Sequence, residues 1–135
     1  MSDCIFCKIV AGEIPSYKIY EDEHVYGFLD INPVGPGHTL LIPKVHSENL
    51  LESSDEHVDE LMRAVKKVAP SILKAVGSEG FNLVNNYGAI AGQTVFHTHF
   101  HIIPRFPDDG HRPWHGHGAA EDVLTKVAED IKAKM

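Results

Sequence analysis

Three histidines spaced two residues apart are the part of the sequence best suited to chemistry. His97, His99 and His101 lie in a run of apolar and β-branched residues, and residues two apart share one face of a strand. We therefore expect a strand over residues 93–103 that presents three imidazoles on one face. The opposite face would pack on a helix and would carry Phe96, Thr98, Phe100 and Ile102. Core packing alone does not explain three imidazoles, because aliphatic side chains fill such space without polar atoms.

Besides a plain exposed polar face, two kinds of chemistry fit three neighbouring imidazoles. One is a single metal ion held by all three rings. In a strand, however, the Cα atoms of His97 and His101 lie roughly 13 Å apart at ~3.3 Å per residue, so both rings would have to lean inward. The other is nucleophilic catalysis at phosphorus, in which the central His99 attacks and a flanking ring donates a hydrogen bond to the phosphate or its leaving group.

Cys4 and Cys7 form a C-x₂-C pair near the start of the chain. Three interpretations are open: two small buried apolar residues, a redox pair, or half of a zinc site. A redox pair of this kind belongs between a strand and a helix of a βαβ unit, which this segment does not resemble. A zinc site needs two further ligands, for which His46 and His97 are available.

The elements that must position these residues are mostly short strands. A helical turn is expected over residues 4–10, and a glycine- and proline-rich loop over residues 30–37. Runs of branched and aromatic residues predict further strands over residues 17–20, 25–29, 39–42 and 81–85. His38 stands just before one of these strands, where it could either support the site or only pack.

The clearest helix begins near residue 53. Ser53 and Glu56 have the spacing of a capping box, and apolar residues then recur at three-four steps as far as Val76. Pro70 should kink or split this helix, and Gly77 should end it. A closing helix is indicated by Ala120, Val123, Leu124, Val127 and Ile131. Together these elements predict an α+β fold with a mostly antiparallel sheet of about five strands, one long helix and a C-terminal helix.

Length and charge exclude several classes of protein. The 135 residues fit one domain, residues 1–135, with a core at residues 3–106 and a tail at residues 107–135. Twelve basic and nineteen acidic residues give a net charge of −7, which disfavours nucleic-acid and membrane partners. No segment approaches the ~20 apolar residues of a membrane span, and the start of the chain lacks signal-peptide features. We therefore expect a cytoplasmic protein.

Residues 106–118 are predicted to form an irregular solvated tail. The three histidines in this tail could instead close over a substrate or a partner subunit; they are His111, His115 and His117.

The sequence of residues 92–103 resembles the signature of the histidine triad (HIT) superfamily, His-φ-His-φ-His-φ-φ, where φ is apolar. Residues 4–15, 28–33 and 37–46 are also similar to segments of Hint-like bacterial members. The resemblance implies the HIT fold, a homodimer with a continuous sheet, and a purine nucleotide site beside the triad. It also implies cleavage at the α-phosphate of nucleoside phosphoramidates or related nucleotides through a nucleotidyl-histidine intermediate, with no catalytic metal.

Position by position, the resemblance makes His99 the nucleophile and His101 the ring that contacts the phosphate. The other implied substrate-binding residues include Asp30, which would hold the ribose hydroxyls; they are Asp30, Ile31, Asn85, Gly92, Gln93 and Thr94. Many Hint proteins follow the triad with Gly-Gly-Arg, whereas this chain has Ile103, Pro104 and Arg105, closer to the fragile-histidine-triad branch. Two alternatives therefore stay open: a dinucleoside polyphosphate hydrolase, and a nucleotide-binding HIT protein with little turnover.

The resemblance also implies a ligand set for zinc. Some HIT relatives place a structural zinc ion on two cysteines and two histidines that match Cys4, Cys7, His46 and His97. In that arrangement His97 is a structural ligand, and His99 and His101 remain for chemistry.

Overall fold

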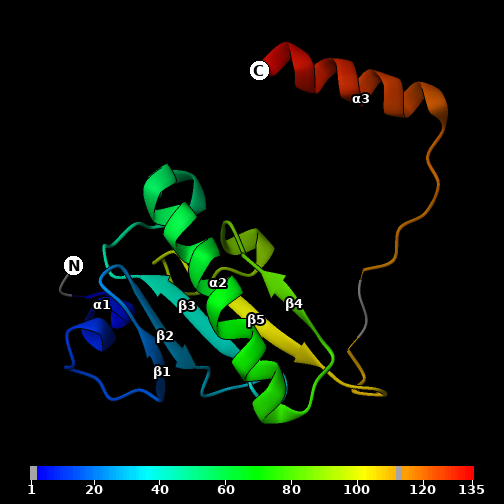
Figure 1. Ribbon diagram of the computed structural model, residues 1–135. Coiled ribbons are helices and arrows are strands. Elements are labelled where there is room, and N and C mark those ends of the chain that lie inside the picture. The colour runs from blue at the N-terminus through cyan, green and yellow to red at the C-terminus, as the bar shows by residue number, and fades with distance from the viewer. Residues whose placement is uncertain (1–2, 112–113) are drawn as a thin grey trace.

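A single antiparallel sheet of five strands forms the centre of the computed structural model, which describes residues 3–111 and 114–135 (Figure 1). Its spatial order is β1-β2-β3-β5-β4, and every neighbouring pair is antiparallel. The strands are β1 (Lys18–Glu21), β2 (Val25–Leu29), β3 (Thr39–Pro43), β4 (Gly80–Val84) and β5 (Phe100–Arg105). The α+β prediction with a mostly antiparallel sheet is confirmed.

Helices cover both faces of this sheet. The long helix α2 (Asp55–Val76) lies across one face, and the short helix α1 (Ile5–Val10) lies on the other (Figure 1). The central strand β3 is buried along its whole length and serves both cores. Leu41 points into the core beneath α2, whereas Leu40 and Ile42 join the core around α1, as the alternation of a strand requires. The α1 face is the one that carries the functional site.

The predicted bounds of the strand over residues 93–103 are wrong at both ends. The observed strand β5 begins later, at Phe100, and ends later, at Arg105. The register of β3 with β5 would place Thr98 opposite Pro43, and a proline has no N–H to continue the ladder. The Thr98 N–H instead donates to the carbonyl of Ser47 at 2.8 Å. Phe96 therefore lies in a loop and is half-exposed. The prediction that it packs beneath α2 is wrong. At the other end, Pro104 continues the strand beyond the last β3 partner and pairs only with Phe81 of β4.

Helix α2 begins one residue later than the capping-box spacing indicated. Its N-cap is Ser54, whose hydroxyl accepts the N–H of His57 at 3.2 Å. The hydroxyl of Ser53 is occupied elsewhere, because it donates to the carbonyl of Asn49 and lies 2.9 Å from the hydroxyl of Thr98. Pro70 does not split the helix, which runs without a break to its left-handed C-cap at Gly77.

The closing helix is present as α3 (Glu121–Lys134), which stands away from the sheet (Figure 1). Its apolar stripe is exposed, with Val123, Leu124, Val127 and Ile131 all about half-accessible. Two short 3₁₀ turns complete the described elements, η1 (Leu50–Glu52) and η2 (Ala89–Ala91). The expected tail at residues 106–118 includes residues 112–113, which lie outside the described residues. Among the described residues, no helix combines the length and apolar character needed to cross a membrane.

Candidate active site and metal centre

A cavity of about 410 Å³ opens on the α1 face of the sheet. One wall is apolar and comes from α1, the turn after it and the neighbouring strands; it includes Ile5, Phe6, Ile9, Ile14 and Phe28. The polar residues of the lining include Asp30, Thr94, His99 and His101. A mostly apolar cavity with a few polar groups in its lining is typical of a small-molecule site.

The ring of His99 is held in one protonation state by its surroundings. Its Nδ1 lies 2.7 Å from the carbonyl oxygen of His97. Because a carbonyl can only accept, Nδ1 must carry the ring proton, and Nε2 keeps its lone pair. Burial lowers the pKa of His99 below its ordinary value of 6.5, so the ring is neutral at pH 7. The amide of Asn85 donates to the carbonyl of His99 at 3.0 Å and fixes the backbone behind it.

His101 is held in the opposite tautomer by His38. The N–H of Val34 donates to Nδ1 of His38 at 3.0 Å, so the proton of a neutral His38 is on Nε2. That Nε2 lies 2.8 Å from Nδ1 of His101, which therefore accepts and leaves the N–H of His101 on Nε2. Burial, reinforced by the neighbouring His99 and His38, lowers the pKa of His101 to about 4. The site thus pairs a neutral acceptor, His99, with a neutral donor, His101, and their ring centroids are 5.0 Å apart.

The sequence left the role of His38 open, and the structure places it behind the site. In the β3–β5 register Leu40 faces His101, so His38 is the diagonal neighbour of His101, within reach of a long side chain. Only the strand pairing reveals this contact. Asp30 lies close by, with one carboxylate oxygen 3.6 Å from His38 Nε2, too long for a hydrogen bond. Asp30, His38 and His101 could also be grouped as metal ligands. Because Val34 keeps the proton on His38 Nε2, we interpret His38 and His101 as a hydrogen-bonded pair, with the Asp30 carboxylate close by.

The expected substrate-binding residues divide into two groups. Asp30, Ile31 and Thr94 line the cavity together with His99 and His101. Asn85, Gly92 and Gln93 are absent from the cavity lining: the amide of Asn85 supports the backbone of His99, and Gly92 and Gln93 belong to the supporting loop. The buried amide of Gln93 accepts from the N–H of Gly88 and donates to the carbonyls of Glu48 and Val95. In this structure that amide holds the loop together and is not free to face the cavity. The tail histidines are likewise outside the cavity lining.

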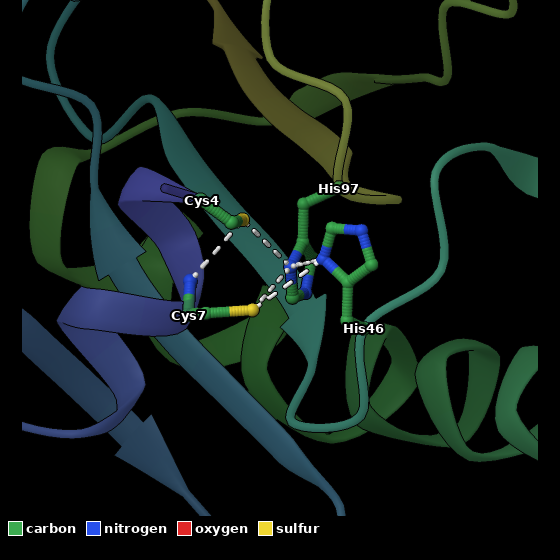
Figure 2. Close-up of side chains that lie close together, drawn as sticks. All are labelled: Cys4, Cys7, His46 and His97. Carbon is green, nitrogen blue, oxygen red and sulfur yellow. Dashed lines mark hydrogen bonds between the residues drawn. The ribbon is translucent and has the colours of Figure 1, made fainter. Parts of the chain in front are cut away.

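His97 points away from the cavity and into a cluster with Cys4, Cys7 and His46 (Figure 2). Its Nδ1 lies 3.3 Å from Cys4 Sγ, 3.5 Å from Cys7 Sγ and 3.2 Å from Nδ1 of His46. Its Nε2 lies 2.8 Å from the carbonyl of Pro43, so Nε2 carries the proton and Nδ1 faces the sulfurs with its lone pair. This divergence excludes the single ion held by all three triad rings, which we considered from the sequence.

The four residues fit a structural zinc site. With Zn–S at ~2.3 Å and Zn–N at ~2.0–2.1 Å, tetrahedral ligands lie about 3.5 Å apart for a sulfur and a nitrogen, and about 3.3 Å for two nitrogens. The separations around His97 match these values. The two cysteines form no disulfide. Burial and the proximity of Cys4 raise the pKa of the Cys7 thiol, so a thiolate here requires a neighbouring positive charge. The pairing of His97 with a carbonyl is the usual second contact of a ligating imidazole.

The antiparallel sheet, with a histidine triad beside a cavity on one face, defines a HIT-type protein. Residues 11–108 match the family model described as HIT domain, and the chain belongs to the HIT family. It is 56% identical over 135 residues to the Bacillus subtilis protein named hit, covering 98% of this chain and 92% of that protein. It is 41% identical over 135 residues to an adenosine 5′-monophosphoramidase of Schizosaccharomyces pombe, covering 98% of both.

Further similar proteins include one named for a second activity and one solved with bound zinc. An adenylylsulfatase of Arabidopsis thaliana is 49% identical over 104 residues, which cover 77% of this chain and 53% of that protein. Among solved structures, one from Streptococcus mutans UA159 has a TM-score of 0.93 at 45% identity and covers 99% of this chain and 86% of that one. A Zn-bound histidine triad family protein of Mycobacterium smegmatis has a TM-score of 0.76 at 40% identity, covering 80% of this chain and 78% of that one.

Proposed function

We propose that this protein is a nucleotide hydrolase or transferase that cleaves nucleoside phosphoramidates, or related substrates, at the α-phosphate through a nucleotidyl-histidine intermediate on His99. The observation that carries the proposal is the pair of fixed tautomers, a free Nε2 lone pair on His99 beside an Nε2–H on His101. The related adenosine 5′-monophosphoramidase and adenylylsulfatase both act on nucleotide derivatives, which supports the same class here.

The proposed reaction has two displacements at phosphorus. Nε2 of His99 attacks the α-phosphorus, and the bond to the leaving group breaks. The leaving group departs with the bonding electron pair and takes a proton from solvent. Water then attacks the phosphorus, the bond to His99 breaks and its electron pair returns to Nε2, while the water proton passes to solvent. The Nε2–H of His101 donates to the phosphate or to the leaving group throughout, and stabilises charge in the transition state.

The substrate would lie with its base against the apolar wall and its ribose at Asp30. The wall formed by Phe6, Ile9 and Phe28 suits a flat aromatic base, and we propose a purine. One oxygen of Asp30 already accepts the N–H of Asn32 at 2.8 Å, and the carboxylate keeps further acceptor capacity for two ribose hydroxyls. Thr94 and Ile31 lie at the same cavity and would contact the phosphate and the sugar.

We propose a structural zinc ion on Cys4, Cys7, His46 and His97, and no catalytic metal. A closed set of four ligands leaves no open position for substrate. The Zn-bound relative supports this assignment. By family resemblance we also propose a homodimer, and for the free thiols a reducing compartment such as the cytoplasm.

Parallel assays of substrate classes test the proposal. Adenosine phosphoramidate and a diadenosine polyphosphate are each incubated with the protein, and AMP release is followed. Faster turnover of the phosphoramidate supports the proposed function, and faster turnover of the polyphosphate supports the fragile-histidine-triad alternative. Binding of AMP without turnover of either substrate would indicate a nucleotide-binding protein and contradict the enzyme.

A further inference from the structure

Helix α1 contributes residues to two sites at once. Cys4, which caps the helix, and Cys7 point into the cluster with His46 and His97 (Figure 2). From the same helix, Ile5, Phe6 and Ile9 form part of the apolar wall of the cavity. One short segment of the chain therefore supplies both part of the wall of the substrate cavity and half of the proposed metal-ligand set.

This segment depends on tertiary anchors for its position. It has six residues, whereas isolated helices shorter than ~12–15 residues are marginal in water. Within it only Phe6 and Ile9 are buried. The cysteine–histidine cluster is its other anchor, and that cluster joins α1 to two distant parts of the chain, at residues 46 and 97.

Phe6 contacts the nucleophile itself. Its ring centroid is 5.1 Å from that of His99, with the planes at 90°, and 5.9 Å from that of His97. The edge-on contact with His99 is a favoured aromatic geometry. A second connection runs through the backbone, because the carbonyl that accepts from His99 Nδ1 belongs to His97. A displacement of α1 or His97 would thus reach both the cavity wall and the ring of His99.

We propose that metal occupancy of the cysteine–histidine cluster sets the affinity of the cavity for nucleotide, with Phe6 as the positioning residue between them. This proposal rests on the proposed function. With the four ligands tied together, α1 closes the apolar wall and Phe6 confines His99. Without the metal, α1 is held by the packing of Phe6 and Ile9, with partly buried Val10 beside them. Part of the free energy of nucleotide binding is then spent on ordering the wall.

Calorimetric titration with AMP compares the zinc-loaded protein with protein stripped by a chelator, freed of it and kept reduced. Circular dichroism confirms that both forms are folded. We expect the Kd for AMP to rise at least tenfold on metal removal and to return on addition of one zinc ion per chain. An unchanged Kd in folded, metal-free protein would overturn the proposal and leave the proposed function intact. A zinc-loaded protein that does not bind AMP would overturn both.

The Phe6→Leu variant tests the positioning role of Phe6 even if the metal-free chain unfolds. The variant keeps all four metal ligands, so it should retain one zinc ion per chain. We expect at least a threefold rise in the Kd for AMP, together with changed imidazole ¹⁵N shifts of His99. Val65→Ala, in the separate core beneath α2, is the matched control; it should lower stability but leave both readouts unchanged. Wild-type affinity and His99 shifts in Phe6→Leu would overturn the positioning role.

Discussion

The carbonyl oxygen of His97 accepts a hydrogen bond from Nδ1 of His99 at 2.7 Å, while the ring of His97 faces the cysteines. One residue therefore serves two sites, with its side chain in the cysteine–histidine cluster and its backbone carbonyl fixing the tautomer of His99. The three triad histidines are evenly spaced in the sequence but have three different environments. Each environment determines which ring nitrogen carries the proton and which keeps its lone pair.

The proposed role of His101 as a hydrogen-bond donor to the substrate depends on His38. In His38→Leu, Nδ1 of His101 loses its 2.8 Å partner, and the ring is free to move its proton to Nδ1. We expect kcat for adenosine phosphoramidate to fall roughly 10- to 100-fold, less than the ~10²–10³-fold of a donor removed outright, because the ring of His101 remains, with a smaller change in KM. Steady-state kinetics measures both. An unchanged kcat would show that His38 only packs.

The lowered pKa of His101, about 4 in the folded state, predicts acid destabilisation. In the unfolded chain this pKa is ~6.5, so between the two values the unfolded state binds more protons. The contribution of His101 to stability is therefore complete above pH 6.5 and is lost as the pH falls toward 4. His101→Gln cannot titrate, and its free energy of unfolding should fall less over this range, by roughly 1–3 kcal/mol. Urea denaturation at several pH values tests this, and parallel curves for the two proteins would contradict it.

Much of the fold was predictable because the apolar pattern fixes it locally. The continuous apolar run at Leu40–Ile42 predicts a strand buried on both faces, and β3 is one. The loop at residues 93–99 was not predictable from local sequence, since the end of the ladder at Phe100 and the bond of the Thr98 N–H to the Ser47 carbonyl depend on residues distant in the chain. The contact of His38 with His101 likewise depends on strand register. The triad was visible from its spacing, whereas the separation of His97 from the other two rings was expected only through the family resemblance, and the structure places that ring beside the cysteines of the α1 segment.

Asp30 should discriminate ribose from dideoxyribose. Asp30→Asn keeps the oxygen that accepts from Asn32 but loses the negative charge. We expect ribonucleotide binding to weaken by ~1.5–3 kcal/mol, the value of charge-assisted hydrogen bonds, with much less effect on a 2′,3′-dideoxynucleotide. Calorimetry with both ligands measures the difference. An equal loss for the two ligands would mean that Asp30 supports only the loop.

The cluster of Cys4, Cys7, His46 and His97 should contain zinc in protein purified without chelator. Elemental analysis is expected to find about one zinc ion per chain, the content of a closed four-ligand site. Cys7→Ser should lose the metal and lower the melting temperature, whereas Ile5→Ala, a neighbour in α1 that is not a ligand, should retain the metal. A wild-type protein of equal stability with and without zinc would contradict a structural role.

The covalent intermediate on His99 is the central claim, and trapping it is the most direct test. Protein mixed rapidly with adenosine phosphoramidate, quenched in alkali and analysed by mass spectrometry should carry one adenylyl group per active site, and peptide mapping should place it on His99. His99→Ala should form no adduct and should lose turnover while still binding AMP. Near-normal kcat in His99→Ala, or fast wild-type turnover with no adduct at any time point, would contradict the mechanism.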